Sequence, residues 1–238
     1  MSLLSVSEYP SLAIEDGLAR ELDMLEQIKA RAQPPLHMVW SADPLCYVAP
    51  KAMAPAISGA FEAARSRGVN CHYRTTGGDV VPQGPGILTY SLAFRLPKSD
   101  PAAITTAYAE ICAPLISALS ALGLEARTGA IEGSYCDGAY NVSLGGRKLA
   151  GTALRMAVIP RAPGEWAVLG HAMITLTEAA LGAFTEVNTL YDAASIKRRI
   201  DLATVTSIEG LGLSQAAFRQ RLKEALSERY DDALSRPT

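Results

Sequence analysis

Two adjacent glycines, Gly145-Gly146, place the strongest constraint on the fold, because they separate two apolar runs with the character of strands. The runs cover residues 140–144 and 147–159. Since both glycines tolerate positive φ, they predict a two-residue β-hairpin turn. A hairpin joins antiparallel strands, so a wholly parallel sheet is disfavoured.

Segments typical of helices and strands alternate along the rest of the chain. Residues 12–31 carry apolar side chains mostly at three- and four-residue steps, the period of an amphipathic helix. Further helices are expected over residues 50–67, 101–122, 178–192 and 214–234, with a weaker helical signal over 194–202. Strands are expected over residues 37–40, 69–75, 86–96, 124–131 and 166–176. We therefore predict one α/β (α+β) domain over residues 1–238, with a mixed, largely antiparallel sheet flanked by helices.

Composition and charge narrow the classes of function. Hydrophobic residues make up 49% of the 238 residues and charged residues 19%, which suits a globular protein. The formal net charge of -2 disfavours nucleic-acid binding. No segment resembles a secretory signal or reaches the roughly 18 uncharged apolar residues of a membrane span. We therefore expect a cytoplasmic protein with neither a nucleic-acid nor a membrane partner.

A glycine-rich segment, residues 74–86, is the first candidate for a functional site. Its paired glycines, Gly77 and Gly78, let the backbone approach a ligand, and their N–H groups can hold a carbonyl or phosphate oxygen. Arg74 would add a charged partner for a bound anion. The segment lacks the patterns of a Walker loop or a dinucleotide fingerprint. A purely structural loop with an ion-paired Arg74 is the alternative.

Cys136 and Lys148 form the second candidate. The chain has four cysteines and no CxxC pair, which argues against a zinc site and against a disulfide framework: Cys46, Cys71, Cys112 and Cys136. Of these, only Cys136 is framed by glycines, where a bent backbone can present a thiol. A nucleophilic cysteine needs a lowered pKa, which Lys148 or Arg74 would provide by proximity, whereas Asp137 would oppose it. An inert buried cysteine and a solvated lysine are the alternatives.

Together these segments resemble the catalytic domain of the biotin/lipoate protein ligase superfamily over residues 39–213. In that family the Arg-x-x-Gly-Gly loop wraps the acyl group, and the lysine of Gly-Arg-Lys-x-Ala-Gly contacts the acyl carbonyl. The resemblance implies a catalytic role for Lys148. It also implies a set of substrate-binding residues: Arg74, Thr76, Gly77, Gly78, Gly86, Tyr140 and Gly151.

Residues 134–141 further resemble the Ser-Phe-Cys-x-Gly-x-Tyr-Asp stretch of bacterial octanoyl amidotransferases, which act through a cysteine thioester. This resemblance implies that Cys136 is the acyl acceptor, with Lys148 and loop N–H groups stabilising the oxyanion. It implies transfer of an octanoyl or lipoyl group from an octanoyl or lipoyl donor to a lysine of a lipoyl-domain acceptor protein, without a cofactor. Asp79 departs from the family, because the amidotransferases carry an apolar residue there.

Two alternatives remain open at this point. An ATP-dependent lipoate-protein ligase would form lipoyl-AMP with ATP and Mg²⁺, and Cys136 would be incidental. A non-catalytic acyl-binding protein would keep the pocket without turnover. His171 is a candidate base, although a lone histidine on an apolar strand is more often a core residue. The run Lys197-Arg198-Arg199 is interpreted as a solvated face.

Overall fold

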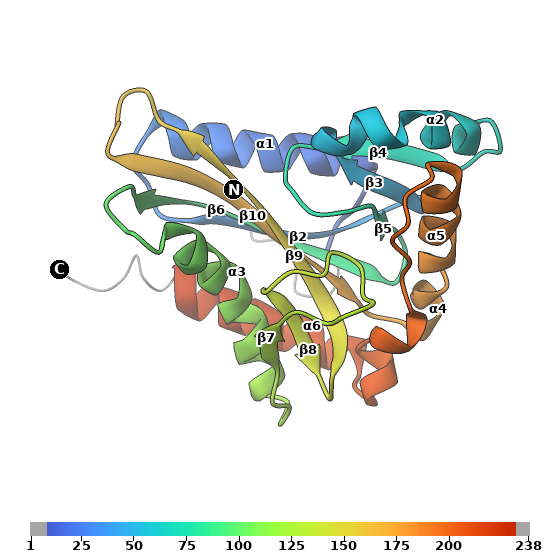
Figure 1. Cartoon of the computed structure of the whole chain (residues 1–238). Coiled ribbons are helices and arrows are strands. Elements are labelled where there is room, and N and C mark those ends of the chain that lie inside the picture. The colour runs from blue at the N-terminus through green and yellow to red at the C-terminus, as the bar shows by residue number, and fades with distance from the viewer. Residues whose placement is uncertain (1–8, 232–238) are drawn as a thin grey trace.

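A seven-stranded sheet forms the centre of the protein, in the order β1-β2-β6-β10-β9-β8-β7 (Figure 1). The computed structural model describes residues 9–231. In this order the strands are β1 (Ser11–Leu12), β2 (Leu36–Ala42), β6 (Ile87–Pro97), β10 (Glu165–Thr175), β9 (Arg147–Val158), β8 (Asn141–Leu144) and β7 (Arg127–Gly129). Only the short β1–β2 pair is parallel, and all other neighbours are antiparallel. The predicted mixed, largely antiparallel sheet is confirmed.

The predicted hairpin joins β8 to β9. Gly145 has φ 55° and Gly146 has φ 77°, so both occupy the left-handed region that a two-residue turn of this kind requires. The turn pairs Leu144 with Arg147. A register shift in β8 follows between Val142 and Ser143.

A second, three-stranded sheet consists of β3 (Cys46–Pro50), β4 (Asn70–Arg74) and β5 (Val81–Gln83). Its central strand β3 is parallel to β4 and antiparallel to β5. The sequence did not predict β3 or β5. Every residue of β3 is buried, so it lacks alternation, and the three residues of β5 include a proline.

Helices flank the two sheets: α1 (Ile14–Ala30), α2 (Ala54–Arg65), α3 (Ala103–Ser120), α4 (Glu178–Leu181), α5 (Phe184–Ala193) and α6 (Gln215–Leu226). In Figure 1, α1 lies above the central sheet and α3 and α6 lie below it, whereas α2 covers the small sheet at the upper right and α4 and α5 lie at the right side. Shorter turns complete the order: 3-10 helices Lys51–Met53, Leu202–Thr204 and Glu209–Leu211, and the π-helix Ser227–Asp231.

Three predicted helices differ from the structure. The helix expected over 178–192 is two helices, α4 and α5, with Gly182 at the C-cap of α4. The helix expected over 194–202 is wrong, because α5 ends in a Schellman turn: Ser195 has φ 57° and the Ile196 amide donates to Tyr191 O. The helix expected to reach residue 234 is described only to Asp231, and its remainder lies outside the described residues.

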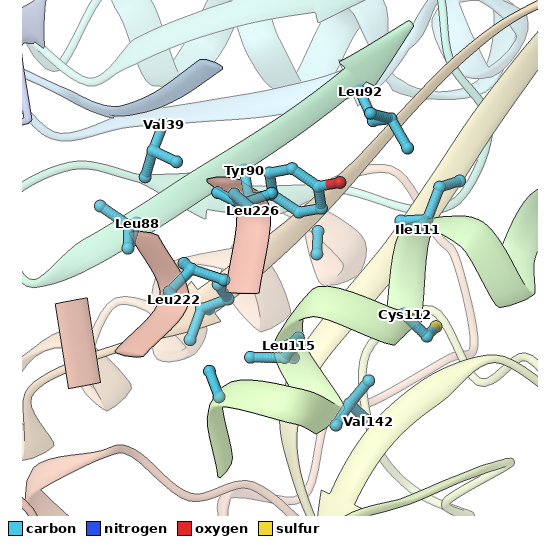
Figure 2. Packing of buried hydrophobic residues seen from close by; sticks show 14 of the residues in the cluster. Val39, Leu88, Tyr90, Leu92, Ile111, Cys112, Leu115, Val142, Leu222 and Leu226 are labelled. Carbon is cyan, nitrogen blue, oxygen red and sulfur yellow. The ribbon is translucent and has the colours of Figure 1, made fainter. Parts of the chain in front are cut away.

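The main core lies between the central sheet and the two lower helices. Figure 2 shows Tyr90 and Leu92 of β6, Leu115 of α3 and Leu222 of α6 packed together. By length and composition alone α3 is apolar enough to cross a membrane, but its inner face is buried in this core. Because side chains alternate along a strand, His171 of β10 lies on the opposite face of the sheet from Ala172 of this core.

Candidate active site

A small cavity lies on the upper face of the central sheet, beside the glycine-rich loop. The residues that line it include Arg74, Gln83, Tyr135, Cys136, Gly151 and His171. Its volume is about 10 Å³, which is room for about one water molecule. A larger groove between α3 and β7, about 700 Å³, has no charged side chain in its lining. The small cavity is therefore the candidate site.

Cys136 lies in a tight turn before β8 and has φ 45°, which is uncommon outside glycine. Its Sγ accepts a hydrogen bond from the Asp79 amide at 2.9 Å. Its own amide donates to Asp79 Oδ2 at 3.0 Å. The neighbouring Asp137 carboxylate instead accepts from the Ile131 amide at 2.9 Å. The thiol therefore faces the glycine-rich loop, and the acidic residue that contacts Cys136 is Asp79 rather than Asp137.

The thiol of Cys136 is not activated by charge alone. Burial raises its pKa, and the nearby cations Lys148 and Arg74 lower it without reversing that effect. The sequence predicts that these cations lower the thiol pKa. They do lower it, but the larger effect of burial leaves the pKa above its ordinary value. The thiol therefore stays protonated near neutral pH and needs a base to become a nucleophile.

Lys148 lies near the start of β9 and is fully buried, with 0% exposure, so the alternative of a solvated lysine is wrong. Its Nζ donates to the carbonyl oxygens of Tyr135 and, at 3.3 Å, Cys136. It also lies 3.6 Å from the centroid of the Tyr135 ring. Burial lowers the pKa of Lys148 to about 8. A substantial fraction of the amine is therefore neutral near pH 8 and can accept a proton.

Gly151 makes room for this lysine and for Tyr135. A Cβ at position 151 would lie 2.5 Å from the Tyr135 ring and 3.1 Å from Lys148 Cε. Tyr135 is itself fixed by stacking on Phe184, with ring centroids 4.6 Å apart. Gly151 therefore shapes the wall of the cavity, and its contact with substrate stays a prediction.

Arg74 holds the glycine-rich loop in shape. The guanidinium is 4% exposed and donates to three backbone carbonyls: Val48 at 2.6 Å, Gly77 at 2.7 Å and Asp79 at 2.8 Å. These three bonds use Nη1 and Nη2, whereas the buried Nε has no hydrogen-bond partner among the described residues. An anion would therefore have to compete for the two Nη groups. Its charge still acts on the Cys136 thiol.

The two loop glycines have different environments. Gly78 has φ 91°, and a Cβ there would lie 3.1 Å from Cys136 Sγ and 3.0 Å from Arg74 Nη2. The Gly77 amide donates to Leu154 O at 3.3 Å, so it is not directed at the thiol. The loop amide that meets the sulfur belongs to Asp79.

Thr76 belongs to a buried polar network behind the cavity. Its Oγ1 lies 3.2 Å from His171 Nε2, and His171 Nδ1 lies 3.4 Å from Glu21 Oε1. Glu21 also accepts from Ser91 Oγ at 2.5 Å. His171 thus lines the cavity while both its nitrogens face protein groups. Glu21 was missed from the sequence, although it lies on the buried face of α1.

Gly86 and Tyr140 do not line the cavity. Gly86 has φ 78° and packs against Thr177, whose Oγ1 would lie 2.3 Å from an added Cβ. Tyr140 stacks on Tyr108, with centroids 4.2 Å apart, and its hydroxyl lies 3.0 Å from Thr105 Oγ1. The structure gives both residues a packing role, and their substrate contacts stay predictions.

Arg198, like Glu21, lies at the site but was not predicted there from the sequence. Its Nη1 pairs with Asp79 Oδ2, whereas the adjacent Arg199 pairs with Asp192 at 2.8 Å. The three residues of this basic run are exposed, as the sequence predicted, and Arg198 in addition contacts the site through Asp79. Between residues 9 and 231, no three histidine, cysteine, aspartate or glutamate side chains are grouped as metal ligands.

Comparison with known proteins identifies relatives of this chain. The model of the lipoyl protein ligase A/B catalytic domain matches residues 13–227. An octanoyl-[GcvH]:protein N-octanoyltransferase of Kyrpidia tusciae is 29% identical over 209 residues, 86% of this chain and 71% of that protein. An uncharacterized protein of Cupriavidus necator is 33% identical over 237 residues, 94% of this chain and 89% of that protein.

The fold is also similar to that of lipoate-protein ligase A bound with ATP. The TM-score is 0.64 with 18% identity, covering 89% of this chain and 78% of that chain. At this level of identity the similarity establishes the shared architecture of helices and sheet.

Proposed function

The chain belongs to the lipoyl protein ligase A/B catalytic domain family, and we propose that it transfers an octanoyl or lipoyl group to a lysine of a lipoyl-domain protein through a thioester on Cys136. The observation that carries this proposal is the Cys136 thiol, held against the glycine-rich loop with Lys148 buried behind it. The name of the Kyrpidia tusciae relative supports an octanoyl group carried on a GcvH protein as the donor.

In the first half of the reaction, neutral Lys148 accepts the proton of the Cys136 thiol. The sulfur attacks the carbonyl carbon of the donor, and the charge on the carbonyl oxygen is stabilised by the Asp79 amide, the loop N–H group that meets the sulfur. The bond to the donor then breaks, and the leaving amine or thiol takes up the proton from Lys148. The products are the Cys136 thioester and the deacylated donor.

In the second half, the amine of the acceptor lysine attacks the thioester carbonyl. Lys148 accepts a proton from that amine, the carbon–sulfur bond breaks, and the thiolate of Cys136 regains a proton. The products are an amide on the acceptor and the free enzyme. The cycle balances without a nucleotide or a metal ion.

An ATP-dependent ligase is the second candidate, because the fold is similar to that of a ligase bound with ATP. In that case ATP and Mg²⁺ would be required, lipoyl-AMP would be the intermediate, and Lys148 would contact the acyl carbonyl. The Cys136 thiol would have no covalent role. The two candidates therefore differ in their dependence on Cys136.

The intact mass of a lipoyl-domain acceptor separates the candidates. We expect the acceptor to gain an octanoyl group from an octanoylated donor protein without ATP, and the Cys136→Ser variant to lose this transfer. Acylation that requires lipoate or octanoate with ATP and Mg²⁺, releases pyrophosphate and survives Cys136→Ser would establish the ligase instead.

We further propose that the protein works in the cytoplasm. The support is that all four cysteines are free thiols, and three of them are buried. Fractionation of cells followed by immunodetection would test this placement.

A further inference from the structure

Asp79 contacts Cys136 in two ways and at the same time pairs with a distant arginine. Its amide donates to the sulfur at 2.9 Å, and its Oδ2 accepts from the Cys136 amide at 3.0 Å. The same Oδ2 pairs with Arg198 Nη1. One carboxylate oxygen thus joins the glycine-rich loop, the cysteine turn and the segment after α5.

The burial of this ion pair is uneven. The Asp79 side chain is 11% exposed and the Arg198 side chain is 51% exposed. A nearly buried carboxylate needs a partner, because leaving it unpaired in a desolvated environment is costly. Arg198 supplies that partner from the solvent side, so the cation covers the carboxylate beside the thiol.

The segment that carries Arg198 is held at both ends. We call residues 195–201 the strap. At its start Ser195 closes the Schellman turn of α5, and near its end Ile200 exchanges two hydrogen bonds with Asn188, at 2.8 and 2.9 Å. The Asp201 amide then donates to Gly133 O at 2.8 Å, in the turn that leads to Cys136. The strap is therefore tied to the same turn that Asp79 holds.

We propose that the Asp79–Arg198 ion pair is a positioning device for the Cys136 nucleophile, in which Asp79 fixes the residue and Arg198 offsets the charge that the carboxylate brings to the thiol. The inference rests on the proposed function only in taking Cys136 as the nucleophile. Asp79 and Arg198 act through Cys136, so both are positioning residues rather than catalytic ones.

The groups that face the thiol come from several elements. The cations are Arg74 of β4, Lys148 of β9 and Arg198 of the strap. The acid is Asp79 of the glycine-rich loop. The phenols are Tyr108 of α3, Tyr135 of the cysteine turn and Tyr191 of α5. Burial has the largest effect and raises the thiol pKa, the Asp79 carboxylate raises it further, and the cations lower it. Removing either partner of the ion pair therefore changes the thiol in a predictable direction.

Two variants break the same ion pair but should have opposite effects on the thiol. Asp79→Asn removes the negative charge and keeps an oxygen that accepts from the Cys136 amide, so the thiol should ionise at lower pH. Arg198→Gln leaves the carboxylate uncompensated, so the thiol should ionise at higher pH. A purely structural role would loosen the site in both variants and change thiol reactivity in the same direction.

The test is the rate of iodoacetamide alkylation of Cys136 in the full-length protein, followed by intact mass and peptide mapping between pH 6 and 10. At pH 7.5 we expect alkylation to be several-fold faster than wild type for Asp79→Asn and several-fold slower for Arg198→Gln. The ionisation midpoint of the thiol should move to lower pH in Asp79→Asn and to higher pH in Arg198→Gln. Arg198→Lys should restore the wild-type midpoint. Arg199→Gln is the matched control, because Arg199 pairs with Asp192. The ionisation midpoint of the Cys136 thiol should be unchanged in this variant.

Displacements in the same direction in both variants, or none in Arg198→Gln, would overturn the inference. Arg198 is half exposed, so its variants test the sign even if Asp79→Asn does not fold. Alkylation also needs no acyl transfer. If the thiol midpoints moved in opposite directions but Cys136 took up no acyl group, the effect of the ion pair on the thiol would stand and the proposed role of Cys136 as nucleophile would be rejected.

Discussion

Lys148 Nζ lies 3.3 Å from the carbonyl oxygen of Cys136, so a buried amine lies beside the residue whose thiol it would deprotonate. Burial moves the two pKa values in opposite directions, lowering that of Lys148 to about 8 and raising that of Cys136. Both groups are therefore neutral over part of the range above pH 8. This pairing of a neutral thiol with a neutral amine is what the proposed proton transfer requires.

The rate of Cys136 acylation should rise with pH through about 8, because Lys148 accepts a proton only after losing its own. Single-turnover acylation between pH 6 and 9.5 measures this profile. Lys148→Arg, which stays charged, should lose both the rate and the rise. A profile that is flat from pH 7 to 9 in the wild type would exclude Lys148 as the base.

Lys148 should also make stability depend on pH. Its pKa is about 8 in the folded protein against 10.5 for the free side chain, so the unfolded chain binds more protons between these values. Stability therefore rises with pH across that window, by on the order of 3 kcal/mol. Relative to Lys148→Met, the wild type should gain about this much between pH 7.5 and 10.5 in urea unfolding. An unchanged difference would show that the buried amine does not titrate there.

Arg74→Lys should destabilise the protein, because a single ammonium cannot reach the three carbonyls that the guanidinium serves. We expect a loss of about 3 kcal/mol in the free energy of unfolding. Arg67→Lys is the control: Arg67 forms an exposed pair with Glu186, and its loss should cost about 0.5 kcal/mol. Equal effects of the two changes would contradict the role of Arg74 in holding the loop.

The sequence predicted the parts of the site that are local patterns. Gly145-Gly146, the Gly77-Gly78 loop and the turn around Cys136 were found because glycines mark them within a few residues. The burial of Lys148 was not predictable, because a lysine after a hairpin is normally solvated. In this protein the amine contacts the carbonyl oxygen and the ring of Tyr135, which lies in a turn earlier in the chain.

Contacts between distant segments account for the rest of what the sequence could not show. Asp79 was seen only as a departure from the family pattern, since its partner Arg198 lies in a basic run with no local signal. Glu21 is separated from His171 by most of the chain. The strands β3 and β5 are too short and too uniformly buried to show a period of two.

Gly151→Ala should disturb the cavity wall, because the added Cβ would lie 2.5 Å from the buried Tyr135 ring. We expect a loss of about 2 kcal/mol in unfolding free energy and a larger loss of acylation rate than the change in stability explains. Gly164→Ala is the control, since a Cβ there meets nothing within 4 Å. Thermal melts and single-turnover rates on both variants give the comparison.

Covalent capture of the acyl group on Cys136 is the central claim, and intact-mass analysis of the full-length protein after mixing with an octanoylated donor protein tests it most directly. The account predicts one octanoyl adduct on the wild type, mapped to Cys136, released by hydroxylamine and absent from Cys136→Ser. It would be contradicted if the lipoyl-domain acceptor became octanoylated while Cys136 stayed unmodified.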